Sequence, residues 1–180
     1  MGDVVTMSAP NVYVSFDASR SKNPALTDLR YYFLLRAWAR RGSLGQMFTD
    51  VHEMAPSGKP VDLRSELARR LEQSDVLLLI LSEQTRSSRG WLSWEIEFGA
   101  GVCGLPMICS YAGRDLVDPT AGHPEWWPMA LRQVMASRQV QPLHVPFRSR
   151  ALAMGLRRWT AGHSPPLSAE FDCFEPAIRR

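Results

Sequence analysis

The stretch Val76-Leu-Leu-Leu-Ile-Leu81 is the longest apolar run in the chain. Such a continuous run predicts a strand that is covered on both faces, as a central strand of a parallel sheet is. Ser82 ends the run, and a polar segment then leads to Trp91-Leu-Ser-Trp-Glu95. Trp91 and Glu95 are four residues apart, which predicts that they share one face of a helix. Because ligand sites in open parallel sheets lie at the carboxyl ends of strands, Glu95 is a candidate functional carboxylate.

Strands and helices are predicted to alternate along the chain, which is typical of an α/β fold with right-handed crossovers. We expect a three-layer sandwich with a central, parallel, five-stranded sheet (flavodoxin-like). Asn23-Pro24 is expected to start the first long helix, Gly42 to end it, and Pro146 to start the last helix. The expected strands cover 12–16, 46–50, 76–81, 106–111 and 140–145, and the expected helices cover 23–42, 63–71, 90–102, 129–137 and 146–161.

Composition narrows the function classes. The 180 residues, 45% hydrophobic and 22% charged, fit one globular domain, expected over 11–162 between a lead-in (1–10) and a tail (163–180). A net charge of +3 with scattered Arg pairs does not predict nucleic-acid binding. The three cysteines form no CxxC pair, which favours a reduced, cytoplasmic setting, and no His or Cys spacing indicates a metal. No apolar run is long enough for a membrane span, and the N-terminus does not read as a secretory signal.

Four segments occur in a telling order: the first strand 12–16, Phe48-Thr-Asp50, Pro56-Ser-Gly58 with the apolar positions that follow it, and Leu79–Ser82 followed by Trp91 and Glu95. Together they resemble the TIR domain family, particularly the stand-alone bacterial TIR-like proteins of antiviral defence such as Thoeris sensors. The resemblance covers about 11–162, so the expected fold is TIR-like. Two departures stand out: Leu92 follows Trp91 where many members have Cys, and the loop 17–22 lacks an acidic pair common in other members.

The resemblance implies an enzyme that cleaves the nicotinamide–ribose bond of NAD, an NAD nucleosidase or ADP-ribosyl cyclase, with Glu95 as the catalytic residue. NAD is then the substrate, and no cofactor or metal is expected. The expected product is an ADP-ribose-derived signal, a cyclic isomer, made in antiphage defence. The residues expected to bind NAD are Phe16, Asp17, Asp50, Gly58, Ser82 and Trp91, with the Gly58 loop acting as a lid.

One carboxylate is chemically sufficient for this reaction. Glycoside hydrolysis usually needs two, because the leaving alkoxide must be protonated. The nicotinamide of NAD is cationic before cleavage and leaves as a neutral base, so no general acid is needed. Glu95 is therefore expected to bind the ribose hydroxyls and to stabilise the oxocarbenium-like charge.

Two other functions remain open on the sequence. The chain is also consistent with a non-catalytic TIR assembly or adaptor module, in which Trp94, Trp126 and Trp127 are interface anchors. It is also consistent with a nucleoside deoxyribosyltransferase-like enzyme, although the Trp-x-x-x-Glu element and the Pro-Ser-Gly loop argue against this. The partners expected for the enzyme are NAD, further copies of the chain in a filament or other assembly, and a phage-derived trigger, with no nucleic acid or membrane.

Overall fold

The computed structural model describes residues 10–17, 28–44, 49–50, 62–88, 90–118, 120–138 and 140–160, with only the backbone described for 49–50 and 158–160. Several predicted features lie outside these residues. They are the lead-in up to residue 9, the helix start at Asn23-Pro24, the Gly58 loop and the tail from 163.

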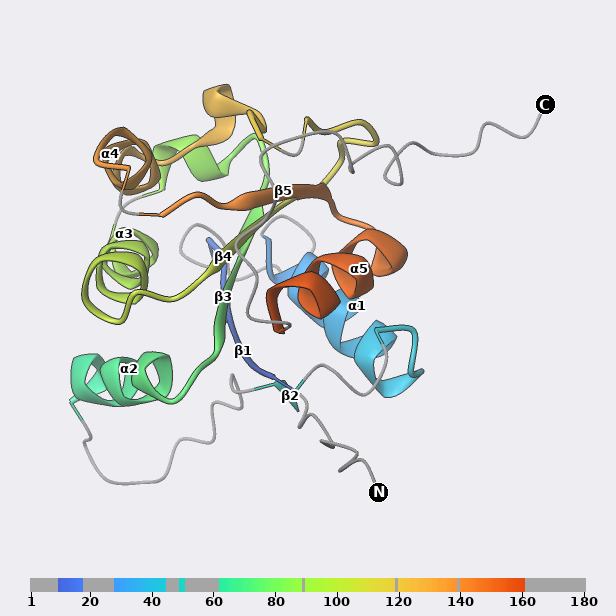
Figure 1. Cartoon of the computed structure of the whole chain (residues 1–180), viewed down its shortest axis with the longest axis horizontal. Coiled ribbons are helices and arrows are strands. Elements are labelled where there is room, and N and C mark those ends of the chain that lie inside the picture. Colours follow the sequence, from blue (N-terminus) through green and yellow to red (C-terminus); the bar gives the residue numbers. More distant parts are fainter. Residues whose placement is uncertain are drawn as a thin grey trace, which may run out of the picture.

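A parallel β-sheet forms the centre of the molecule, with the strand order β2-β1-β3-β4-β5 (Figure 1). This order is the flavodoxin-like one. β2 lies on one side of β1 and the later strands lie on the other, so the strand order reverses between β1 and β3. The predicted α/β class with a parallel sheet is confirmed. Four strands of four residues or more make up most of the sheet, while β2 contributes one short pairing to β1. The strands are β1 (Asn11–Ser15), β2 (Thr49–Asp50), β3 (Val76–Leu81), β4 (Met107–Tyr111) and β5 (Leu143–Pro146).

Helices cover both faces of this sheet and bury a separate apolar cluster on each (Figure 1). The central strand β3 shows why, because all of its side chains are buried and alternate between the two clusters. One face carries α1 (Leu29–Arg40) and α5 (Ser149–Thr160). The other carries α2 (Leu63–Glu72), α3 (Trp91–Ile96), the π-helix η4 (Glu97–Val102) and α4 (Met129–Ala136).

The helix predicted over 90–102 is present in two parts. It begins as α3 at Trp91 and continues as η4 to Val102. Leu92, Glu95 and Ile96 are the buried residues of α3. A carboxylate therefore occupies a core-facing position between two apolar residues, where it needs hydrogen-bond partners. π-Helical turns are frequent at functional sites.

The prediction that Pro146 starts the last helix is wrong. Pro146 is the last residue of β5, paired with Tyr111, and α5 begins at Ser149. Proline has no N–H to donate, so a sheet tolerates it on an edge strand, and β5 is an edge strand of this order. The predicted strand 140–145 correspondingly moves to 143–146.

A buried polar network ties the long connection after β4 to the sheet. Trp127 Nε1 donates to Tyr111 Oη at 2.7 Å, and Tyr111 Oη lies 2.8 Å from His144 Nδ1. Burial lowers the pKa of His144 to about 4, so the ring is neutral at pH 7. This network holds the short helix η5 (Pro124–Trp126) at the end of the sheet.

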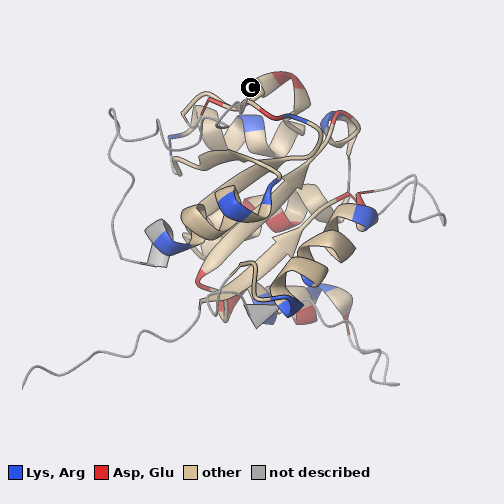
Figure 2. Ribbon diagram, turned by 90° about the vertical axis from the view of Figure 1, so that its right-hand side faces the viewer, with Lys and Arg blue, Asp and Glu red and all other residues tan. Residues whose placement is uncertain are grey.

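The arginines of the described residues are spread over several helices and loops rather than gathered in one stripe (Figure 2). No helix among the described residues has the length and apolar character that a membrane span requires.

Candidate active site

Glu95 is held by two hydroxyl groups of the neighbouring strand. Tyr13 Oη donates to Glu95 Oε1 at 2.7 Å, and Ser15 Oγ donates to Glu95 Oε2. Tyr13 and Ser15 are two residues apart on β1, so both side chains point to the face that α3 covers. The side chain of Glu95 is only 7% exposed. Glu95, the residue predicted to be catalytic, is therefore a carboxylate fixed in the protein interior at the carboxyl end of β1.

The electrostatics of this carboxylate reflect a balance of burial and hydrogen bonding. Burial raises the pKa of Glu95 above its ordinary value of 4.5, and the hydrogen bonds from Ser15 and Tyr13 partly oppose this. Burial and the nearby Glu95 raise the pKa of Tyr13, so that phenol stays protonated and remains a donor. Each carboxylate oxygen has a second lone pair that these hydroxyls do not use. The group can therefore accept further hydrogen bonds from a ligand.

Phe16 and Asp17, two of the residues predicted to bind NAD, follow β1 directly. The Phe16 ring stacks on Tyr32 of α1, with ring centroids 5.0 Å apart. Asp17 is 7% exposed and lies close enough to Asp28 to raise the pKa of that carboxyl. One ring face of Phe16 is therefore occupied by Tyr32, and Asp17 belongs to a buried polar cluster.

Ser82 joins the same cluster from β3. The hydroxyls of Ser82 and Thr85 lower the pKa of Asp28, although burial has the larger and opposite effect. Thr85 Oγ1 donates to Asp28 Oδ2 at 3.2 Å. Asp28 was missed from the sequence because the expected helix start at residues 23–24 places it inside a helix, whereas it immediately precedes α1.

Trp91 and Glu95 have different surroundings. Trp91 is 47% exposed and packs edge-on against Trp94, with ring centroids 5.9 Å apart. Trp94 in turn stacks on Phe98 at 5.0 Å. Trp91 therefore belongs to an aromatic row along α3 and η4, and a pocket-wall role for it stays a prediction.

The remaining predicted ligand contacts are only partly described. Asp50 pairs with Val12 through the backbone at the end of β2, as the sequence indicated, and its side chain is not described. Gly58 lies outside the described residues. Within the described part of the chain, no group of three or more His, Cys, Asp or Glu side chains is arranged to hold a metal ion.

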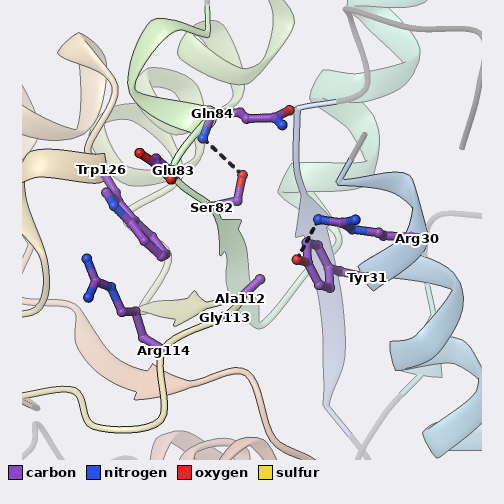
Figure 3. A pocket seen from close by; sticks show the side chains of 9 residues that line it. All are labelled: Arg30, Tyr31, Ser82, Glu83, Gln84, Ala112, Gly113, Arg114 and Trp126. Atoms are coloured by element: carbon purple, nitrogen blue, oxygen red, sulfur yellow. Dashed lines mark hydrogen bonds between the residues drawn. The ribbon is translucent and has the colours of Figure 1, made fainter. Parts of the chain in front are cut away.

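A cavity of about 420 Å³ opens beyond the carboxyl ends of β3 and β4 (Figure 3). Its volume falls within the usual range for small-molecule sites. Of the predicted ligand-binding residues it contains Ser82, while Glu95 is not in its lining. The lining residues are Arg30, Tyr31, Ser82, Glu83, Gln84, Ala112, Gly113, Arg114 and Trp126.

Comparison with known protein families shows which family this chain belongs to. A family model of the TIR-like domain of the Thoeris protein ThsB matches residues 13–113, which is more than half of the chain. The chain belongs to this family of Thoeris TIR-like domains. The match includes Tyr13 and Ser15 of β1, Ser82 just after β3, and the helix that carries Glu95. Among solved structures, the TIR domains of the activated Roq1 resistosome, which directly recognizes the pathogen effector XopQ, align with a TM-score of 0.42 and 16% identity over 85% of this chain and 84% of that chain.

Proposed function

We propose that this Thoeris TIR-like domain cleaves the nicotinamide–ribose bond of NAD and makes an ADP-ribose-derived, cyclic signal in antiphage defence. The observation that carries the proposal is the buried Glu95 carboxylate, held by Tyr13 and Ser15 at the carboxyl end of β1. Membership of the Thoeris family supports the defence role. NAD is the substrate, and the reaction takes place in the cytoplasm.

In the proposed reaction the bond between ribose C1′ and the nicotinamide nitrogen breaks, and its electron pair neutralises the pyridinium. Glu95 accepts hydrogen bonds from the ribose hydroxyls through its unused lone pairs and stabilises the positive charge that develops on the sugar. Capture of C1′ by water, with loss of a proton, gives ADP-ribose. Capture by a nucleophile within the same molecule gives a cyclic isomer, and exclusion of water from the site favours this outcome.

The decisive test is product analysis. The purified chain is incubated with NAD, alone and under conditions that promote self-association, and nicotinamide and the nucleotide products are separated by chromatography and identified by mass spectrometry. We expect free nicotinamide and a product with the mass of ADP-ribose minus water. Absence of nicotinamide release in every assembly state contradicts the proposal. A parallel reaction with deoxynucleosides tests the deoxyribosyltransferase alternative.

Hydroxyl donors on β1 give a sharper prediction on pH dependence. Tyr13→Phe removes the hydrogen bond that lowers the pKa of Glu95 and keeps the ring in the core. Because the active form is the carboxylate, activity falls as the pH drops through the pKa of Glu95. We expect the acid limb of nicotinamide release to lie above 4.5 in the unmodified chain and at a still higher pH in Tyr13→Phe. The measurement is the rate between pH 4 and 8.

Ser15→Ala removes the donor to the other carboxylate oxygen and is expected to shift the acid limb in the same direction. Thermal melting of each variant separates a shifted pKa from a loss of folded protein. An unchanged acid limb in both variants contradicts the role assigned to these hydroxyls.

A non-catalytic assembly module is the second candidate, and the aromatic row of Trp91, Trp94 and Phe98 favours it. Trp91 is half exposed, and the Arg64 guanidinium lies 5.5 Å from the Trp94 ring centroid. Exposed tryptophan and arginine are frequent interface anchors. Trp126 and Trp127 are buried, so they do not supply the interface expected of them. Size-exclusion chromatography showing assembly without NAD turnover supports this candidate.

A further inference from the structure

The cavity beyond β3 and β4 has a basic lining with aromatic support. Arg30 enters from the start of α1 and Arg114 from the connection after β4, so the two guanidinium groups stand on opposite walls (Figure 3). Among the described residues of the lining, Glu83 is the only acidic one and stands against two arginines, which gives those residues a net charge of +1. This balance favours an anionic ligand.

Both guanidinium groups are oriented by an aromatic ring. The Arg114 guanidinium carbon lies 4.8 Å from the ring centroid of Trp126, and that of Arg30 lies 4.6 Å from the centroid of Tyr31. Arg30 also donates a hydrogen bond to Tyr31 Oη at 2.8 Å. Arg114 approaches Glu125 only at 3.7 Å, in a half-exposed pair that contributes little. A guanidinium has five N–H donors in a planar fork, a geometry that matches the oxygens of a phosphate.

The cavity lies close to Glu95 along the same edge of the sheet. Ser15, which donates to Glu95, pairs with Leu79 in the parallel register of β1 and β3. Ser82 in the cavity lining lies three residues beyond Leu79, a distance of roughly 10 Å along an extended strand. Such a separation suits two parts of one extended ligand.

We infer that this cavity binds the diphosphate of the adenosine half of NAD and of its ADP-ribose products, through Arg30 and Arg114. Ser82 and Gln84 add a hydroxyl and an amide to the lining, and Trp126 adds apolar surface. The inference rests on the proposed function for its choice of ligand. It assigns this cavity to the part of the dinucleotide that does not react, with Glu95 at the reacting ribose.

Calorimetric titration with ADP tests the inference without any turnover. We expect ADP and ADP-ribose to bind, and nicotinamide riboside, which has no diphosphate, to bind at least tenfold more weakly. Arg114→Gln is expected to weaken ADP binding about tenfold or more, because a hydrogen-bonded charge is lost. Arg30→Gln is expected to act in the same direction. Arg150→Gln, at an exposed position on α5 outside the lining, is the charge-matched control and should leave the affinity unchanged.

Salt provides an independent readout. ADP affinity should fall as ionic strength rises, and less steeply in Arg114→Gln than in the unmodified chain. The inference is overturned if ADP fails to bind at millimolar concentration, or if Arg114→Gln binds it as tightly as Arg150→Gln does. Failure of the proposed function gives a different result, in which ADP binds with the expected arginine dependence but NAD releases no nicotinamide.

Discussion

Glu95→Gln is expected to reduce the rate of nicotinamide release from NAD by about 10²–10³-fold. The substitution keeps the size and shape of the side chain, removes its negative charge and replaces one acceptor oxygen with an NH2 donor. A preorganised group that stabilises charge in the transition state contributes an effect of this size in other enzymes. The measurement is the initial rate of nicotinamide release at saturating NAD, under the assembly conditions in which the unmodified chain is active.

The variant is expected to fold as well as the unmodified chain at pH 7. Since burial raises the pKa of Glu95, the folded state holds this proton more tightly than the unfolded state. The protonated Glu95 side chain therefore contributes to the stability of the fold below pH 4.5. This contribution is lost as the pH rises through the raised pKa of Glu95 in the folded protein. At pH 7 the ionised carboxylate opposes folding, and Gln removes that cost, while its amide can still pair with the hydroxyls of Tyr13 and Ser15.

Glu97→Gln is the matched control, because Glu97 is exposed and lies just two residues away. It should retain the full rate. Equal activity of the two variants contradicts the catalytic role of Glu95, whereas equal loss in both points to a general effect of charge on α3 and η4.

The parts of the fold that the sequence predicts are those governed by local apolar pattern. The uninterrupted run 76–81 has the same bounds as β3, because a strand buried on both faces leaves no polar position to blur its ends. The predicted helix 90–102 corresponds to α3 and η4 together. Pro146 was assigned to the wrong element because proline suits both a helix start and an edge strand, and only the pairing with β4 decides between them.

Some residues of the candidate site could likewise be predicted from the sequence, and others could not. Glu95 could be selected from its place after the central strand, but its partners Tyr13 and Ser15 are more than 75 residues away in sequence. Tyr13 and Ser15 are two residues apart, so they lie on the face of the strand opposite Val12 and Val14. This alternation was the only sequence signal that the two hydroxyls share one face. Asp28 and the arginines of the cavity gave no such signal. Arg30 and Arg114 meet across one cavity only because α1 and the connection after β4 both begin at the same edge of the sheet.

Gly122→Ala, in the connection after β4, is expected to cause a large loss of stability. A Cβ at this position would lie 2.3 Å from Tyr111 Oη and 2.5 Å from His144 Nδ1, both part of the buried network. Gly122 also has φ +58°, which costs an alanine about 1–2 kcal/mol. Overpacking adds about 1–3 kcal/mol, and a disrupted buried hydrogen bond adds about 1 kcal/mol.

Together these effects predict a destabilisation of about 3–6 kcal/mol and a fall in Tm of roughly 10–20 °C, measured by thermal melting at pH 7. Gly113→Ala separates the two causes, because Gly113 has φ +90° but no heavy atom within 4 Å of the new Cβ. It should lose only the backbone share, about 1–2 kcal/mol, and melt a few degrees below the unmodified chain. If the two variants melt together, the contact of Gly122 with Tyr111 and His144 does not determine how the connection packs on the sheet.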